Sequence, residues 1–400
     1  MKILFLTSFY SGLKRSVETG TWNPSGMPAI YKLLEGFKEK QINFDYCFVD
    51  KNITTTKEFS INFFKASRFF VLGCASRYKS INLLNKIIYK PLYFIKLYKF
   101  LKKINVNDYN IVYIDRSNVS AFLIIHLFFK VNGILRLHGI GLQYVKFKKS
   151  KVYFVKNVFN FISYKLPFKF IIASRDGTPV DKFLEEFTNK KSRKVILLNG
   201  VDSKISEKKY NNNNNKINFL FVGRLEKDKG IVEIVESFKR HKLKDEIYLT
   251  IIGDGSLKEY VRKHTSQVSH INFVGSLTHD EVNKYYITSD VFISFNYLGN
   301  ISNVVLEAIK YNLLIITFEK DIENEKDIDS NDFLGENVIY VSRKTAVESL
   351  MNTINILHEN DKYLEIFKFK VRENLLPKIT SWEERINKEI EIIINNQIIL

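Results

Sequence analysis

The chain has 400 residues, of which 45% are hydrophobic, enough to bury the cores of two domains of ordinary size. Its only cysteines, Cys47 and Cys74, belong to no Cys-x-x-Cys pair, which argues against a disulfide framework or a zinc cage and fits a reducing compartment. The net charge of +18 lies in the first half, because residues 1–200 contain 34 Lys and Arg against 12 Asp and Glu, whereas residues 201–400 contain 27 against 31.

Short β-branched and aromatic runs alternate with helical stretches along the chain. The first run, Lys2–Phe9, resembles a short signal-peptide core, but its apolar run is brief and no small-residue cleavage site follows, so we interpret it as a buried strand. Further strands of the first half are expected at Phe44–Asp50, Asn110–Asp115, Ile134–His138, Lys169–Ser174 and Lys194–Leu198. Those of the second half are expected at Ile217–Arg224, Ile247–Gly253, Ile271–Gly275, Val291–Phe295, Leu313–Phe318 and Asn337–Val341.

This alternation predicts an α/β protein with two doubly wound, Rossmann-like domains, whose parallel sheets are covered on both faces. We expect the first domain at residues 1–200 and the second at residues 201–378, with the polar, Asn-rich stretch Ser203–Lys216 as a linker or surface loop. Ligands of such sheets bind beyond the carboxyl ends of the strands, so functional residues are sought there.

Two stretches carry much of the positive charge. Phe63–Ile104 contains ten Lys or Arg and Tyr144–Phe170 contains seven Lys, and neither contains an acidic residue. Both interleave bases with aromatic and aliphatic side chains, a pattern typical of attachment to an anionic membrane surface. A solvated basic face over ordinary core helices is the alternative, and nucleic acid ranks last because the chain has no nucleic-acid-binding motif. No hydrophobic run reaches the roughly 18–20 residues that span a bilayer.

The most informative loop follows the expected strand Ile217–Arg224. It begins at Gly223-Arg224 and ends at Lys229-Gly230. Gly223 lets the backbone turn close to a ligand, and a guanidinium beside an ammonium suits a diphosphate that leaves with its negative charge. An ordinary charged surface turn is the alternative.

A second loop, beginning at Gly299, follows the strand Val291–Phe295 and opens a helix. Ser302 is the expected N-cap, and the helix dipole with the free amides of this terminus would form a phosphate site; the loop residues are Asn300, Ile301, Ser302 and Asn303. Glu307 lies more than one turn into the helix, in an apolar stretch. Because burying an unpaired carboxylate is costly, we expect a polar partner such as ribose hydroxyls, unless Glu307 is on the exposed face.

Weaker signals lie at other strand ends. Gly253 and Gly275 end strands in tight turns, and Asn199-Gly200-Val201-Asp202 follows the last strand of the first half. His138 stands beside Gly139 at a strand end, where a neutral imidazole is a good donor or acceptor; a structural histidine is the alternative. Ser25 and Gly26 precede the helical stretch Pro28–Lys38, whose N-terminus would face the acceptor side of the site.

No metal is expected to be obligatory. Asp327-Ile328-Asp329 has the spacing of a metal motif but lies in an acidic stretch that we interpret as an exposed loop. Arg224 and Lys229 would neutralise the leaving diphosphate in place of a metal.

Taken together, these residues resemble family 4 of the retaining glycosyltransferases, the "group 1" enzymes of the GT-B fold. The resemblance is strongest from about Ile217 to Phe318, where GR–KG, GDG, FVG and SNVVLEA follow one another in the family's order and spacing. It is weaker from Met1 to Asp202 and does not include the basic insert 63–104. The stretch beginning at Ser381-Trp382 looks like the family's segment that crosses back onto the first domain, which places a crossing-back helix at residues 379–400.

The resemblance implies roles for particular residues. His138 would contact the transferred sugar near the reacting carbon, and Arg224 and Lys229 would hold the diphosphate of the donor. Glu307 would bind the ribose, and the amides from Asn300 to Asn303 would touch the β-phosphate and sugar. The implied reaction is transfer of a sugar from a UDP- or GDP-sugar, with retention, to a glycan or lipid-linked acceptor of the cell envelope. The implied location is the cytoplasm, peripherally at the inner face of the cell membrane.

One position departs from the family's pattern. The family usually has a second acidic residue eight positions before Glu307, placed to bind the donor sugar, and here that position is Gly299. This departure leaves two alternatives open: a nucleotide-sugar-binding, membrane-associated protein without transfer activity, and a nucleotide-sugar epimerase of the same fold.

Overall fold

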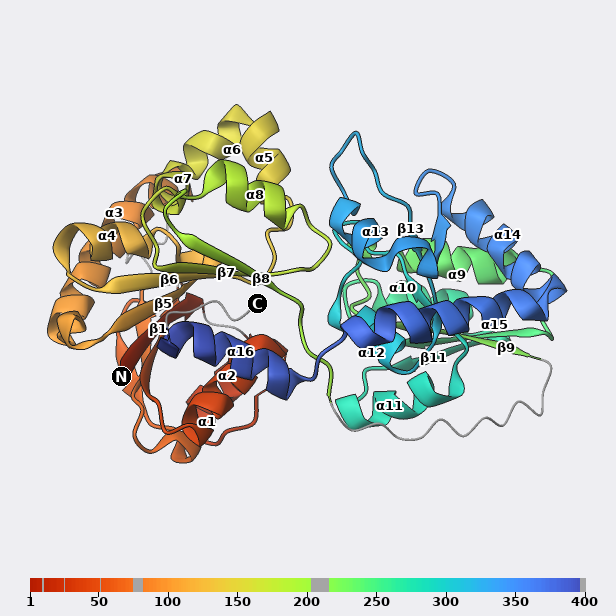
Figure 1. The fold of residues 1–400 in the computed structure, drawn as a ribbon, viewed down its shortest axis with the longest axis horizontal. Coiled ribbons are helices and arrows are strands. Elements are labelled where there is room, and N and C mark those ends of the chain that lie inside the picture. The colour runs from red at the N-terminus through yellow and green to blue at the C-terminus, as the bar shows by residue number, and fades with distance from the viewer. Residues whose placement is uncertain (9–10, 25, 51, 75–81, 203–215, 396–400) are drawn as a thin grey trace. The chain divides into compact units, whose positions relative to one another are not determined.

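The computed structural model describes residues 1–8, 11–24, 26–50, 52–74, 82–202 and 216–395. Ser25 and nearly all of the expected linker Ser203–Lys216 lie outside the described residues. The chain forms two compact units (Figure 1). Unit 1 consists of Met1–Ser174, Val180–Leu197 and Trp382–Leu400, and unit 2 consists of Arg175–Pro179 and Leu198–Ser381.

Unit 1 is built on an eight-stranded sheet in the order β3-β4-β2-β1-β5-β6-β7-β8. Its strands are β1 Lys2–Ser8, β2 Asn43–Asp50, β3 Lys57–Phe59, β4 Phe69–Gly73, β5 Ile111–Asp115, β6 Asn132–Leu137, β7 Phe170–Ser174 and β8 Arg193–Leu197. Neighbouring strands pair in parallel except the edge strand β3, which is antiparallel to β4, so this sheet is mixed rather than purely parallel.

The basic stretch 63–104 is part of this sheet and not an insertion outside it. It supplies β4 and the whole of helix α3, Asn82–Lys103. Phe70 of β4 and Leu97 and Leu101 of α3 lie in the hydrophobic core. The sequence analysis did not predict β3 and β4, because β3 is a short and mostly exposed edge strand and bases lie near the buried strand β4.

Two layers of helices cover the sheet of unit 1. One core contains side chains from α3, α4 Ala121–Phe128, α5 Gln143–Lys149, α7 Val158–Tyr164 and α8 Val180–Phe187, while α6 Lys151–Lys156 packs at its margin. The opposite core contains side chains from α1 Ser11–Thr19, α2 Pro28–Glu39 and the last helix, α16 Trp382–Asn395. The expected crossing-back helix is thereby confirmed: α16 packs against α2 in unit 1 (Figure 1).

Unit 2 is built on a six-stranded parallel sheet in the order β11-β10-β9-β12-β13-β14. Its strands are β9 Ile217–Val222, β10 Ile247–Ile252, β11 Ile271–Gly275, β12 Val291–Ser294, β13 Leu314–Phe318 and β14 Ile339–Val341. Its helices are α9 Ile231–Arg240, α10 Lys258–Thr265, α11 His279–Thr288, α12 Asn303–Lys310, α13 Ile328–Leu334, α14 Ala346–Glu359 and α15 Asp361–Lys370, followed by a π-helical turn at Val371–Leu375. Separate cores on the two faces confirm the doubly wound prediction.

All twelve strands expected from the sequence are present, several of them shorter than expected. Arg224 lies two residues beyond the end of β9, and His138 lies one residue beyond β6. Both side chains are therefore carried by loops at the carboxyl ends of strands, where a parallel sheet binds its ligands.

Candidate functional site

Three glycines at the carboxyl ends of adjacent strands in unit 2 allow their loops to approach one another. The Gly223 N–H donates to the Ile252 carbonyl at 3.0 Å, and the Gly253 N–H donates to the Gly275 carbonyl at 2.8 Å. Gly253 has φ +151°, and a Cβ atom there would lie 1.8 Å from the Gly223 carbonyl oxygen. Gly253 thus has a steric role, because any side chain would push apart the ends of β9 and β10.

The Gly253-Asp254-Gly255 turn fixes the loop that carries Arg224. A Cβ atom on Gly255 would lie 2.6 Å from the Leu225 carbonyl oxygen, and the Leu225 N–H donates to the Asp254 carbonyl at 2.9 Å. Glu226 adds a side-chain anchor, because it accepts bonds from the Ser256 N–H at 3.0 Å and hydroxyl at 2.6 Å. The bonds from Ser256 lower the pKa of Glu226. Glu226 is therefore ionised and holds this loop at neutral pH.

Arg224 and Lys229 line one pocket of about 290 Å³ at the strand ends of β9 and β12. Its other lining residues are Phe221, Val222, Gly223, Phe292, Ile293, Ser294, Phe295, Asn296, Ser302, Asn303 and Val304. The Arg224 side chain is exposed, whereas that of Lys229 is 22% exposed, with Asp228 3.8 Å from its Nζ. Burial, reinforced by the charge of Arg224, lowers the pKa of Lys229. A pocket with two cations near each other favours a ligand with more than one negative charge.

The first turn of α12 forms one wall of this pocket. Ser302 and Asn303 line the pocket, and Ser302 is the N-cap residue with extended backbone, as expected, although its side chain makes no capping hydrogen bond. The Asn199 side-chain amide donates to Asn303 Oδ1 at 2.8 Å, which orients Asn303. The helix N-terminus expected from the sequence is therefore in the pocket, with its dipole favouring an anion.

Asn300 and Ile301 differ from their expected role, because their amides are already bonded within unit 2. The Asn300 N–H donates to Asp327 Oδ1 at 2.8 Å and to Ser330 Oγ at 2.9 Å, and the Ile301 N–H donates to the Asp176 carbonyl at 3.3 Å. The Asn300 side chain is fully buried and bonds to Ser294 and Asp327. These two residues therefore shape the loop, and the amides that remain for an anion are those of Ser302 and Asn303.

Asp327 is the centre of this buried network and was wrongly expected in an exposed loop. It is 0% exposed and accepts bonds from Asn300, Ser330 and Arg343. Among the described residues, no group of three or more His, Cys, Asp or Glu side chains has an arrangement that could hold a metal ion. Metal independence itself stays a prediction.

Gly299 is fixed by close contact with the segment Arg175–Pro179. A Cβ atom on Gly299 would lie 2.5 Å from the Asp176 carbonyl oxygen and 3.1 Å from the Thr178 nitrogen. On the other side of this contact, Gly177 has φ +87°, and a Cβ there would lie 2.7 Å from the Asn300 nitrogen. No acidic side chain fits at position 299 while this segment is in place, so the departure from the family's pattern has a steric cause.

Glu307 on α12 has two titratable neighbours that the sequence did not single out as a group. His279 Nδ1 lies 3.9 Å from Glu307 Oε1, and His279 Nε2 lies 2.8 Å from Asp202 Oδ2. Glu307 is 17% exposed, and burial raises its pKa against the opposing effects of His279 and a hydrogen bond from Tyr286. The sequence did contain a signal that places His279 at the beginning of a helix. Thr278 and Glu281 have the spacing of a capping box, and they form one in the structure, so that α11 begins at His279.

His138 lies in unit 1 as a neutral imidazole with an unsatisfied atom. Its Nε2 is buried and has no hydrogen-bond partner among the residues that the structure describes. Burial, followed by the charges of Arg136, Arg385 and Arg116, lowers the pKa of His138 well below its usual value. Arg385 comes from α16, so the crossing-back helix helps to keep this histidine neutral. Gly26, with φ +86°, precedes α2 in the same unit.

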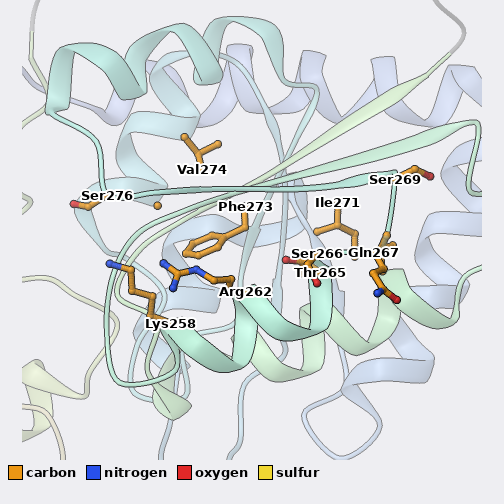
Figure 2. A pocket seen from close by; sticks show the side chains of 12 residues that line it. Lys258, Arg262, Thr265, Ser266, Gln267, Ser269, Ile271, Phe273, Val274 and Ser276 are labelled. Carbon is orange, nitrogen blue, oxygen red and sulfur yellow. The ribbon is translucent and has the colours of Figure 1, made fainter.

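Another pocket, of about 720 Å³, lies beside the edge strand β11. Figure 2 shows Arg262 extending from α10 towards Phe273, with Lys258 on the same helix. Both bases are paired, Lys258 with Asp254 at 2.9 Å and Arg262 with Glu259 at 2.8 Å. This pocket overlaps the expected site only at one end, which Gly275 and Ser276 line. We therefore take the smaller pocket, which Arg224 and Lys229 line, as the candidate anion site.

Comparisons with known proteins agree with this arrangement. Residues 202–373 match the family described as "Glycosyl transferases group 1". An uncharacterised glycosyltransferase of Methanocaldococcus jannaschii is 26% identical over 83% of this chain and 86% of its own length. Among solved structures, a sucrose-phosphate synthase from Thermosynechococcus elongatus covers 99% of both chains with a TM-score of 0.70 and 14% identity. Anabaena HepE, solved with UDP-glucose, has a TM-score of 0.65 and 13% identity over 99% of this chain and 100% of its own.

The matched residues 202–373 contain Arg224, Lys229, Glu307 and His279, and so nearly all of the site in unit 2. Residues 202–373 are therefore a group 1 glycosyl transferase domain, and the chain is a glycosyltransferase with the GT-B fold.

Proposed function

We propose that the protein transfers a sugar from a nucleoside-diphosphate sugar to a glycan or lipid-linked acceptor, with retention of the anomeric configuration. The observation that carries the proposal is the pocket in which Arg224 and Lys229 face the N-terminus of α12. In the reaction, the bond from the anomeric carbon to the β-phosphate oxygen breaks and the acceptor oxygen bonds to that carbon. The acceptor proton is released and the nucleoside diphosphate leaves.

The donor chemistry follows from charge and hydrogen bonding in unit 2. Two cations and the amides of Ser302 and Asn303 suit a diphosphate, whose charge increases as the bond breaks. Glu307, which is on the same helix α12, suits the ribose hydroxyls. HepE was solved with UDP and with UDP-glucose, which supports a uridine donor for the first trials. His138, neutral and with a free Nε2, is the proposed contact of unit 1 to the transferred sugar.

The test is a transfer and hydrolysis assay with UDP- and GDP-sugars. Release of nucleoside diphosphate by the wild-type protein, and its loss in R224A, is the expected result. Saturable binding of donor with neither hydrolysis nor transfer would favour the alternative of a binding protein without activity. Interconversion of two free nucleotide sugars would favour the epimerase. Retention is checked by comparing the anomeric configuration of product and donor.

We also propose that unit 1 attaches to an anionic membrane surface, at the inner face of the cell membrane. Eight large apolar side chains are at least 36% exposed on four of its helices: Ile95 and Tyr98, Leu127 and Phe128, Val152 and Val155, Phe159 and Ile162. Among these helices, α3 contacts α4, α4 contacts α7 and α6 contacts α7, and α3, α4 and α7 lie close together in Figure 1. We call these eight residues the apolar ridge.

Lysines border the apolar ridge. Lys99 and Lys102 on α3 and Lys156 on α6 are exposed, and a basic pocket of about 350 Å³ adjoins α3. Lys90 and Lys96 are less available, because they donate to Ser120 Oγ and to the carbonyls of Thr54 and Gly73. Exposed apolar side chains bordered by bases suit insertion at the level of the lipid headgroups. Attachment then combines apolar insertion with charge, rather than charge alone. No helix in the described part of the chain is long and apolar enough to cross a bilayer.

Co-sedimentation with phosphatidylglycerol and phosphatidylcholine vesicles tests this attachment. The wild-type protein is expected to pellet with phosphatidylglycerol vesicles, and salt is expected to weaken this binding. The variants L127S/F128S and K99E/K102E are both expected to remain in the supernatant. I356S, an exposed isoleucine of α14 in unit 2, is the matched control and is expected to bind normally. Wild-type protein that stays in the supernatant at low salt would contradict the proposal.

A further inference from the structure

We propose that His279 is a positioning residue for Glu307: as an imidazolium held between Asp202 and Glu307, it keeps the Glu307 carboxylate ionised and oriented for the ribose of the donor. The inference rests on the proposed ribose-binding role of Glu307. If His279 acts in this way, nucleotide affinity depends on His279 even though this residue need not contact the nucleotide.

The geometry brings together three segments that are far apart in sequence. Asp202 follows the Asn199-Gly200-Val201 segment, His279 is the first residue of α11, and Glu307 lies in the middle of α12. Asp202 is fixed in place through its neighbour Val201, whose N–H donates to the Thr380 carbonyl at 3.0 Å. Asp202 can therefore orient the imidazole through the bond of 2.8 Å to Nε2, which leaves Nδ1 directed to Glu307 at 3.9 Å.

The charges around Glu307 make His279 the main group that favours its ionised form. Burial disfavours the carboxylate and raises its pKa, and the charge of Asp202 acts in the same direction. His279 opposes them most strongly, ahead of the Tyr286 hydroxyl and the Lys310 ammonium. Lys310 is itself mostly buried, and burial lowers its pKa.

The surroundings of His279 favour its charged form. The hydrogen bond to Asp202 raises the pKa of His279, and Glu307 and Asp280 add to this effect against the opposing effect of burial. The positive end of the α11 dipole also acts against protonation, because His279 is at the N-terminus of that helix. The net direction is upward, so His279 stays protonated to a higher pH than a free histidine.

Glu307 must be ionised to accept two ribose hydroxyls, so nucleotide affinity falls as pH falls through the pKa of Glu307. Replacing His279 with a neutral residue removes the cation that opposes burial, and the pKa of Glu307 rises further. The fall in affinity must then occur at a higher pH than in the wild-type protein.

The experiment is titration calorimetry of the full chain with UDP, and in parallel with GDP, between pH 5 and pH 8. For H279Q we expect the acidic fall in affinity to move up by about one pH unit, as for loss of an opposite charge within 4–6 Å. Below both transitions this corresponds to a roughly tenfold weaker Kd. H279K restores a positive charge and is expected to return the transition towards the wild-type pH. H358Q, on α14, is the matched control and should follow the wild-type curve.

E307Q separates this inference from the proposed function. If E307Q weakens nucleotide binding and H279Q follows the wild-type pH curve, the role of His279 is wrong while that of Glu307 stands. If E307Q binds nucleotide as the wild-type protein does, the ribose-binding role is wrong and the inference fails with it. Thermal unfolding shows which variants are folded, and H279N replaces H279Q if the latter is not, because Asn is well tolerated at the beginning of helices.

Discussion

Two buried carboxylates in this molecule differ in how completely they are paired. Glu389 of α16 in unit 1 lies 3.2 Å from Arg136 and 2.6 Å from Arg385, it accepts a hydrogen bond from the Tyr113 hydroxyl, and it is 0% exposed. Glu307 in unit 2 has its imidazole neighbour, His279, at 3.9 Å and is 17% exposed, and within the described part of the chain no guanidinium forms an ion pair with it. Burial by itself would raise the pKa of either carboxyl. For Glu389 the two guanidiniums reverse the direction, whereas for Glu307 burial prevails.

The difference indicates what each carboxylate does. The charge of Glu389 is balanced by two guanidiniums inside unit 1, and the ion pairs and the Tyr113 hydrogen bond connect α16 to β6 and β5. A carboxylate with an unfavourable environment and partial exposure gains from hydroxyl donors that a ligand brings. This contrast supports the proposed ligand-binding role of Glu307, whereas Glu389 belongs to the framework that holds α16 with its Arg385.

The largest effect is expected from breaking the closed cluster. E389A leaves Arg136 and Arg385 buried without a counter-charge, which typically costs about 3–5 kcal/mol of stability. Urea unfolding, monitored for the transition of unit 1, measures the loss. E383A changes an exposed residue of the same helix and should stay within about 0.5 kcal/mol of the wild type. A loss for E389A as small as that of E383A would show that the cluster is not structural.

The next largest effect is expected at the open site, on turnover rather than on stability. R224A and K229A each remove a cation from the diphosphate pocket, and we expect turnover to fall by about 10²–10³ with thermal unfolding nearly unchanged. Lys227, exposed on the same loop and outside the pocket, provides the control variant K227A. Folded R224A and K229A proteins with wild-type turnover would remove this pocket from the reaction.

A smaller effect is expected from E307Q. Replacing the carboxylate with an amide should weaken nucleotide binding by about 10-fold to 100-fold, the range for a hydrogen bond to a charged group. The rate of the saturated enzyme should change less, because ribose contacts are similar in the ground and transition states. Calorimetry and steady-state kinetics test this, with E348Q on α14 as the control. An equal fall in kcat and kcat/KM would assign Glu307 to the transition state instead.

No effect is expected from chelation. Under the proposed function, Arg224 and Lys229 would neutralise the diphosphate as a metal ion does in other enzymes. Activity should be the same before and after treatment with EDTA. Loss of activity that magnesium or manganese restores would show that the two cations of unit 2 are not sufficient.

Much of the fold could be predicted from the sequence, because most of its strands have patterns that lie within a few consecutive residues. A buried parallel strand needs a continuous apolar run of four to eight residues, so β1 and β9 to β13 are visible as local patterns. The same holds for the loops, because the glycines after β9 and β10 and the bases of the loop after β9 are close in sequence to these strands. β3 and β4 were missed because β3 is an exposed antiparallel edge of three residues and β4 is embedded among bases.

The sequence by itself determined the strand–helix order and the loop with Arg224 and Lys229. Only the tertiary structure decided which polar groups are used up and which remain for a ligand. The Asn300 amide is consumed by Asp327, which lies 27 residues away, and Gly299 is covered by Asp176 from a segment before β8. Asp202 reaches His279 through packing of segments 77 positions apart. Hydrogen bonds and charges act over a few ångströms in space, and chain connectivity alone does not show which distant residues come within that range.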